Sequence, residues 1–141
     1  MRRTLLLLAT LTACTPNADL RGLSIESDLE GGRKDGAATV DHAAWGRVLA
    51  AAVDEPAGRI DYGAVPRGDL DAALAAYGAV DLKTLPAPEQ EALLINAYNA
   101  FTVQLIVSQP ARPDSIRDLK DPWKEARWTV GGHNLSLDDI E

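Results

Sequence analysis

Two asparagines lie three residues apart, Asn96 and Asn99, inside the apolar stretch INAYNAFTVQLIV at residues 95–107. On a helix both side chains face the same way, and a buried amide must find hydrogen-bond partners. An amide does not titrate, so the pair can orient a ligand or stabilise an oxyanion but cannot act as a general base. We interpret the pair as structural, holding the backbone of a neighbouring loop. The alternative is a cleft that binds a substrate amide or carboxylate.

Tyr98 stands between the two asparagines in sequence but points about 100° away from each on a helix. Tyr98 is expected in the core, with its hydroxyl hydrogen-bonded to a neighbouring group. Asp138, Asp139 and Glu141 form a carboxylate cluster of the type that Ca²⁺ and Mg²⁺ prefer. Their spacing is not that of a calcium loop, and carboxylates also stabilise the start of a helix. We therefore predict no metal site and no cofactor.

The two histidines, His42 and His133, have no ligand residues at metal spacing and are expected to be exposed. The sequence contains no nucleotide-binding loop and no serine-hydrolase motif. Its catalytic residues, if it has any, stay unknown. The formal net charge of −7 argues against nucleic acid as a partner, because phosphate binding needs patches of lysine and arginine.

Cys14, the only cysteine, follows two arginines and a short apolar run. This layout is typical of a secretory signal peptide, and LTAC at residues 11–14 resembles a bacterial lipobox, in which the cysteine carries the lipid. A single cysteine cannot form an internal disulfide, which agrees with lipidation. The alternative is an ordinary signal peptide that contains a cysteine.

We therefore expect a lipoprotein signal peptide at 1–13 and a membrane partner reached through the lipid on Cys14. The expected location is the bacterial cell envelope, on the periplasmic face of the outer membrane if the cell has one. The segment 14–38 is rich in small and charged residues and is expected to be a flexible tether. LRGLSI inside it could pack on the domain, but disorder is the expectation.

The elements that must position these side chains are mainly helices. Apolar spacing predicts helices over 40–53, 69–80 and 88–108, with Asp41 capping the first and Gly78 ending the second. Pro88 suits the start of the third helix, and Pro110 lies just past its end. A very short strand is expected within RIDY at 59–62.

The last residues predict a β-hairpin, with strands at 128–130 and 135–137 around Gly131 and Gly132. Ser136 with Asp139 three residues later matches a capping box that opens a helix. The sequence stops one turn later, so we expect the C-terminal part of the domain to be missing. The prediction is a mainly helical α+β domain at 39–141 with a long central helix and a short hairpin.

Several blocks in order resemble domain of unknown function 547, a family of bacterial envelope proteins and plant proteins. They are Trp45 with the helix after it, IDY at 60–62, INAYNAFTV at 95–103, SIRDL at 115–119, PW at 122–123 and GGHNLSLDDIE at 131–141. The asparagine-bearing block and the last block are the specific ones. The resemblance covers about 40–141. It implies that members continue with a histidine, an arginine-bearing helix and a segment rich in cysteine and proline.

Two functions fit these observations. The first is an envelope-anchored module that binds a protein or small-molecule partner, or has a structural role, without chemistry. The lack of a nucleophile–base pair in the sequence favours it. The second is a hydrolase or transferase with a cysteine nucleophile whose catalytic residues lie beyond residue 141. In that case the asparagine-bearing helix would take the central place, an inference by analogy.

Overall fold

The computed structural model describes residues 19–125 and 127–141, and their side chains from residue 25 onward. The predicted signal peptide at 1–13 and the predicted lipidation site Cys14 lie outside the described residues. The five α-helices of this part are α1 (Asp19–Asp35), α2 (Ala43–Ala52), α3 (Arg67–Ala79), α4 (Ala87–Val107) and α5 (Leu137–Ile140). Short 3₁₀ helices are η1 (Leu82–Thr84) and η2 (Ile116–Asp118). No helix of the described residues has the length and apolar character needed to cross a membrane.

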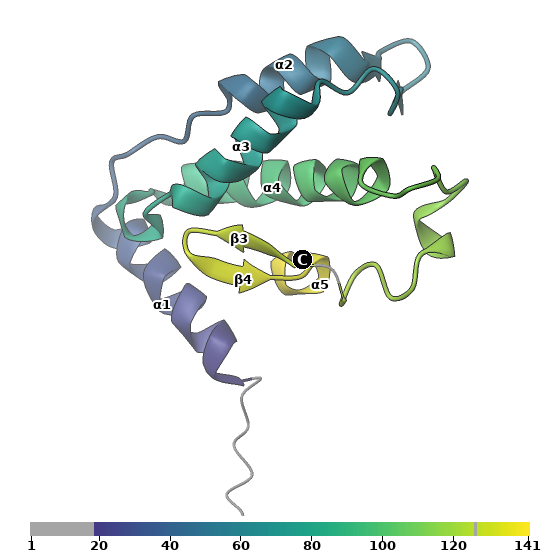
Figure 1. Cartoon of the computed structure of the whole chain (residues 1–141). Coiled ribbons are helices and arrows are strands. Elements are labelled where there is room, and N and C mark those ends of the chain that lie inside the picture. The colour runs from purple at the N-terminus through teal and green to yellow at the C-terminus, as the bar shows by residue number, and fades with distance from the viewer. Residues whose placement is uncertain (1–18, 126) are drawn as a thin grey trace, which may run out of the picture.

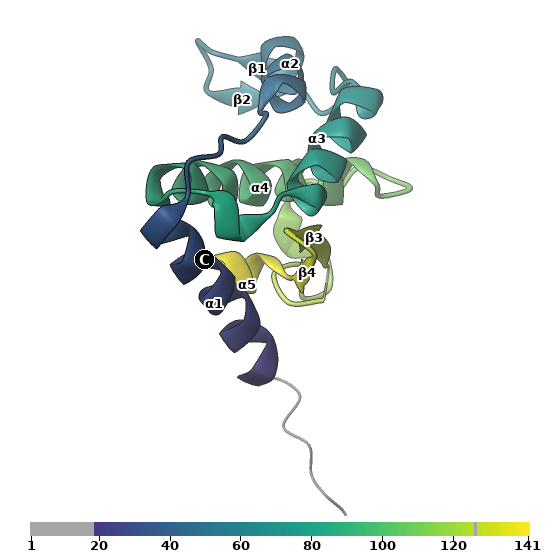
Figure 2. The same ribbon diagram turned by 90° about the vertical axis from the view of Figure 1, so that its left-hand side faces the viewer.

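Helix α4 runs through the middle of the molecule (Figure 1). Figures 1 and 2 show α2 and α3 on one side of it, and the hairpin with α5 on the other. The helix follows Pro86, and Pro88 lies in its first turn, where a fixed φ favours helix and a missing N–H costs nothing. It ends at Val107, three residues before Pro110. The predicted span of 88–108 is confirmed to within one residue at each end.

The core forms because α3 buries its apolar face against one side of α4, and α2 packs on α3. Trp45 and Val48 come from α2, and Leu70 and Tyr77 come from α3. On the other side, the ring of Phe101 stacks on Trp128 of the hairpin, with ring centroids 4.9 Å apart and planes 3° from parallel. Aromatic contacts of this kind add to the free energy gained from burial. The mainly helical α+β fold class is therefore confirmed.

Two small antiparallel strand pairs complete the fold: β1 (Val53–Asp54) with β2 (Arg59–Ile60), and β3 (Trp128–Val130) with β4 (His133–Leu135). The strand expected in RIDY is confirmed as β2. In the second pair, Gly131 and Gly132 both have positive φ, 54° and 83°, which a two-residue hairpin turn requires and glycine adopts without strain.

Strand β4 lies two residues earlier than the predicted 135–137. It ends there because Ser136 caps α5. The Ser136 side chain accepts from the Asp139 N–H, and the Asp139 carboxylate accepts from the Ser136 N–H. The predicted capping box is therefore confirmed.

Helix α1 corrects the expectation of a flexible tether at 14–38, because residues 19–35 are helical and the helix packs on the domain through residues from 25 onward. Ile25 and Leu29, one turn apart, are buried in the core. Gly32 allows the close approach, since a Cβ there would overlap the carbonyl oxygens of Leu82 and Leu85. Gly32 therefore marks a close contact between backbones.

Two helix ends also differ from the predictions. Gly78 lies inside α3, which continues to Ala79 and is followed by extended Val80. Its missing side chain leaves space beside Thr129 of the hairpin, at 3.4 Å from where a Cβ would be to the Thr129 carbonyl oxygen. Helix α2 begins after His42 rather than after Asp41, although the Asp41 carboxylate accepts from the Ala43 N–H at 2.8 Å.

Candidate functional site

A cavity of about 290 Å³ opens between α4 and α5. Its walls are mostly apolar. They consist of Leu94, Ile95, Tyr98, Asn99, Ile140 and Glu141. The side chain of Ile95 is the most exposed large apolar group of the described residues, at 55%. A cavity of this size lies near the lower end of the range for small-molecule sites.

Asn99 brings the polar chemistry to this α4–α5 cavity. It is exposed, and its amide N–H donates to the Ile95 carbonyl oxygen of its own helix at 2.8 Å. From the sequence we interpret Asn99 as holding the backbone of a neighbouring loop. In the structure its hydrogen bond is made within α4 instead. Its amide oxygen and second N–H have no partner among the described residues. They are free to bind a group that enters the cavity.

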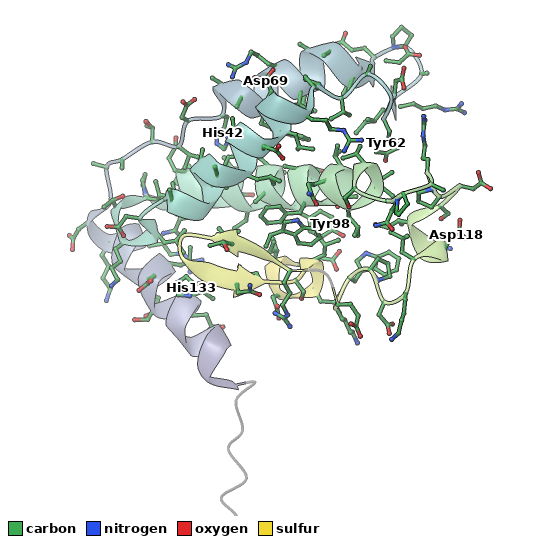
Figure 3. All side chains as sticks on the ribbon, in the orientation of Figure 1. His42, Tyr62, Asp69, Tyr98, Asp118 and His133 are labelled. Carbon is green, nitrogen blue, oxygen red and sulfur yellow. The ribbon has the colours of Figure 1, made fainter. Side chains whose placement is uncertain are left out.

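Tyr98 is half-buried and lines the same cavity while packing against the core. Figure 3 shows it on the side of α4 that faces α5, whereas His42 lies on the opposite side of the helix. Asn96 belongs with His42: its amide nitrogen is 3.3 Å from His42 Nδ1. The two asparagines, expected on one face, therefore contribute to two separate places.

His42, Tyr77 and Asn96 form a polar cluster between the start of α2 and helices α3 and α4. His42 Nδ1 is 2.9 Å from the Tyr77 hydroxyl, while His42 Nε2 is buried and has no partner among the described residues. Burial, with Asp41 nearby, raises the pKa of Tyr77 to about 12. Tyr77 is therefore a neutral phenol at neutral pH and can donate to an imidazole. The cluster joins three helices, and the half-buried imidazole corrects the expectation that His42 is exposed.

His133 is also less exposed than expected, because its Nε2 lies 3.0 Å from a carboxylate oxygen of Asp28 in α1. The hydrogen bond with His133 does most to hold the pKa of the Asp28 carboxyl below its usual range, and a hydrogen bond from Lys83 lowers this pKa further. A carboxylate that orients an imidazole is also part of catalytic triads. Here the pair links the hairpin to α1 across 105 residues of sequence, a spacing that sequence reasoning does not detect.

The acidic residues near the C-terminus have separate roles. Asp139 accepts from the Ser136 N–H and hydroxyl and from Arg127, and the bond from the Ser136 backbone does most to lower its pKa. Asp138 lies 3.9 Å from the Lys124 ammonium group, and Glu141 lines the α4–α5 cavity. In the residues that the structure describes, no group of three or more side chains is arranged to hold a metal ion.

Residues 82–141 match the model of a protein family described as "Protein of unknown function, DUF547". The match supports the DUF547 family. It extends from η1 through α5, so it includes the α4–α5 cavity, Asn96, the hairpin and the capping box. Trp45 and IDY at 60–62, which also carried the resemblance in sequence, lie outside the DUF547 match. No curated protein and no solved structure matches the chain.

Proposed function

We propose that this chain is a binding module that holds an apolar group of its partner in the α4–α5 cavity. The observation that carries the proposal is the cavity itself, with exposed Ile95 on its wall and Asn99 at its side. An exposed apolar side chain on a solvated helix gains free energy only when something covers it. The DUF547 match names no activity, so we infer the ligand from the residues that line the cavity.

The walls define the kind of group that fits. Apolar atoms of Leu94, Ile95 and Ile140 favour an aromatic or aliphatic body. The free amide oxygen of Asn99 accepts a hydrogen bond, so the ligand should carry an N–H or O–H beside that body. The Glu141 carboxylate on the wall disfavours an anionic ligand. We therefore infer a neutral or cationic apolar group with a hydrogen-bond donor.

The proposed place of this module rests on the first residues of the sequence. We propose that Cys14 carries a lipid and that the domain faces the periplasm from the bacterial envelope, on the outer membrane where there is one. The support is the order of charged residues, apolar run and LTAC at 11–14. Growth with radiolabelled palmitate should label the chain, and Cys14→Ala should abolish the label. Label that survives this substitution rejects the anchor.

The cavity is tested with N-phenyl-1-naphthylamine, a neutral apolar dye that carries one N–H and fluoresces when it leaves water. Ile95→Lys places a charge on the cavity wall, at a side chain exposed enough to tolerate it. Burying dye against an unpaired charge is costly, so we expect about tenfold or more weaker binding. The control is Leu49→Lys, which makes the same kind of change at another exposed apolar residue, on α2.

The readout is the ratio of dye affinities between the two variants, measured on the full chain with Cys14→Ser. This comparison cancels any dye bound by the apolar first residues. Selective weakening by Ile95→Lys supports the binding proposal. Equal affinity in both variants, or no saturable binding at all, rejects it. Circular dichroism should show the same helix content in both variants, since both changed residues are exposed.

A further inference from the structure

A second cavity, of about 170 Å³, lies at the far end of α4. It is formed where the loop before α3 meets the residues that follow α4. Its walls are Tyr62, Gly63, Arg67, Ile106, Val107, Gln109 and Arg112. Figure 3 shows Tyr62 beside the C-terminal end of α4, away from Tyr98 and the α4–α5 cavity. The two cavities therefore have different positions and different walls.

The second cavity, which we call the arginine cavity, differs from the α4–α5 cavity in its charge. Arg67 and Arg112 both line it, and within the described part of the chain neither has an ion-pair partner. Elsewhere on this acidic protein, Arg47 and Arg127 lie within 3 Å of a carboxylate oxygen. Two guanidinium groups around one hollow repel each other unless an anion lies between them. An anion in this hollow would be attracted by both charges.

The neighbouring polar groups are already engaged, which leaves the guanidinium donors available. The Asp61 carboxylate, two residues before Gly63, accepts from the Gly63 N–H at 2.8 Å and is not within ion-pair distance of Arg67 or Arg112. The Gln109 amide donates to the Leu105 carbonyl oxygen at 2.9 Å. A Cβ at Gly63 would lie 3.1 Å from Asp61 Oδ1 and 3.7 Å from Arg112 Nη2, so the carboxylate and the guanidinium group both border this turn.

The floor of the cavity is apolar, although the two arginines themselves are exposed. Ile106 and Val107 are buried apolar residues, and the half-buried ring of Tyr62 forms another wall. Low local polarity raises the energy of a charge–charge contact compared with water. The Tyr62 hydroxyl adds one more donor to those of the two arginines.

We propose that the arginine cavity binds a phosphate group. Two guanidinium forks from separate segments, with one phenol, offer more donors than the two oxygens of a carboxylate can accept, whereas phosphate has enough oxygen acceptors. Such a phosphate belongs to a small molecule or to a lipid headgroup, and the two share this chemistry. The proposal is independent of the ligand in the α4–α5 cavity.

The test is a titration of the full chain with inorganic phosphate at fixed ionic strength, followed by the amide resonance of Gly63. We expect saturable shifts at Gly63, and about 10- to 100-fold weaker binding in Arg67→Gln and in Arg112→Gln, because each removes charge-assisted hydrogen bonds. The matched control is Arg117→Gln, an exposed arginine of η2 that removes the same charge outside the cavity. It should change affinity by no more than about twofold, through screened long-range attraction.

The source of the phosphate is decided by a second arm with vesicles of phosphatidylcholine, with and without phosphatidylglycerol, added to the Cys14→Ser chain. Arginine-dependent binding only to the anionic vesicles assigns a headgroup. Binding of inorganic phosphate without vesicle binding assigns a small molecule. Equal losses in Arg67→Gln and Arg117→Gln, or no saturable shift at Gly63 together with no arginine-dependent vesicle binding, would overturn the proposal. Unchanged circular dichroism spectra of the variants exclude unfolding as the cause.

Discussion

The docking of α1 on the domain depends on Gly32, and substitution of this glycine tests it sharply. Ala at position 32 would place a Cβ on the carbonyl oxygens of Leu82 and Leu85, and 2.8 Å from Gln90 Nε2. The obstructing atoms are mainly backbone, so rotation of a side chain cannot relieve the overlap. The helix must move away, and the domain then loses the two hydrogen bonds between α1 and Gln90: the Gln90 amide N–H to the Leu29 carbonyl oxygen at 2.7 Å, and Arg33 Nε–H to the Gln90 amide oxygen at 3.2 Å.

The magnitude follows from these contacts. Two lost hydrogen bonds and a carbonyl left without a partner cost about 2–4 kcal/mol. Replacing a helical glycine with alanine returns about 1 kcal/mol. Gly32→Ala should therefore lower the free energy of unfolding by about 1–3 kcal/mol.

The adjacent Gly31 supplies the matched control. A Cβ there would meet only the Lys83 side chain, with Cγ at 3.8 Å and Cβ at 4.0 Å, which are ordinary contacts. Gly31→Ala should be neutral or raise the free energy of unfolding by up to about 1 kcal/mol. Urea denaturation of both variants, with hydrogen exchange of the α1 amides, gives the comparison. If the two variants agree to within about 0.5 kcal/mol and keep equal protection in α1, the docked position of this helix is refuted.

Three further predictions concern single side chains. Asn99→Ala should leave the free energy of unfolding unchanged or raise it by about 0.5 kcal/mol, because the residue is exposed and alanine is the better helix former; a loss above about 1 kcal/mol in urea denaturation contradicts this. Ser136→Ala should cost about 1 kcal/mol as a lost cap. The pKa of Asp139 is lowered in the folded state, so its contribution to folding stability is complete above the unfolded pKa and is lost as pH falls through the folded pKa. Acid titration of Ser136→Ala should therefore show a smaller loss of stability below about pH 4 than that of the unsubstituted chain. The raised pKa of Tyr77, about 12, means that stability is complete below the unfolded value of 10.0 and is lost as pH rises towards 12; Tyr77→Phe should lack that part of the alkaline loss, and identical profiles would argue against it.

The parts of the fold that could be predicted from sequence are those specified by neighbouring residues. Pro88 and Pro110 bound α4, paired glycines define the hairpin turn, and Ser136 with Asp139 announces α5. Each signal acts through backbone geometry within a few positions. Such signals do not reveal which helix packs on which.

Helix α1 and the two cavities depend on long-range packing. The sequence pointed to Asn99 and Tyr98 as candidate cleft residues, but it did not reveal α1, the second cavity or the segment that closes the first. In the part of α1 with described side chains, only Ile25 and Leu29 are buried apolar residues, too few for a clear amphipathic pattern. The α4–α5 cavity needs residues 94–99 to meet Ile140, over forty positions away. The separation of Asn96 from Asn99 likewise depends on which elements cover each side of α4, although the spacing alone had suggested one common face.

The central claim is that the α4–α5 cavity holds an apolar group, and nuclear Overhauser effects between N-phenyl-1-naphthylamine and the full chain with Cys14→Ser test it most directly. We predict contacts from the dye ring protons to the methyl groups of Ile95 and Ile140, because both side chains line the cavity. Contacts confined to Leu49, on α2, or to the apolar run at 4–12 would contradict the claim.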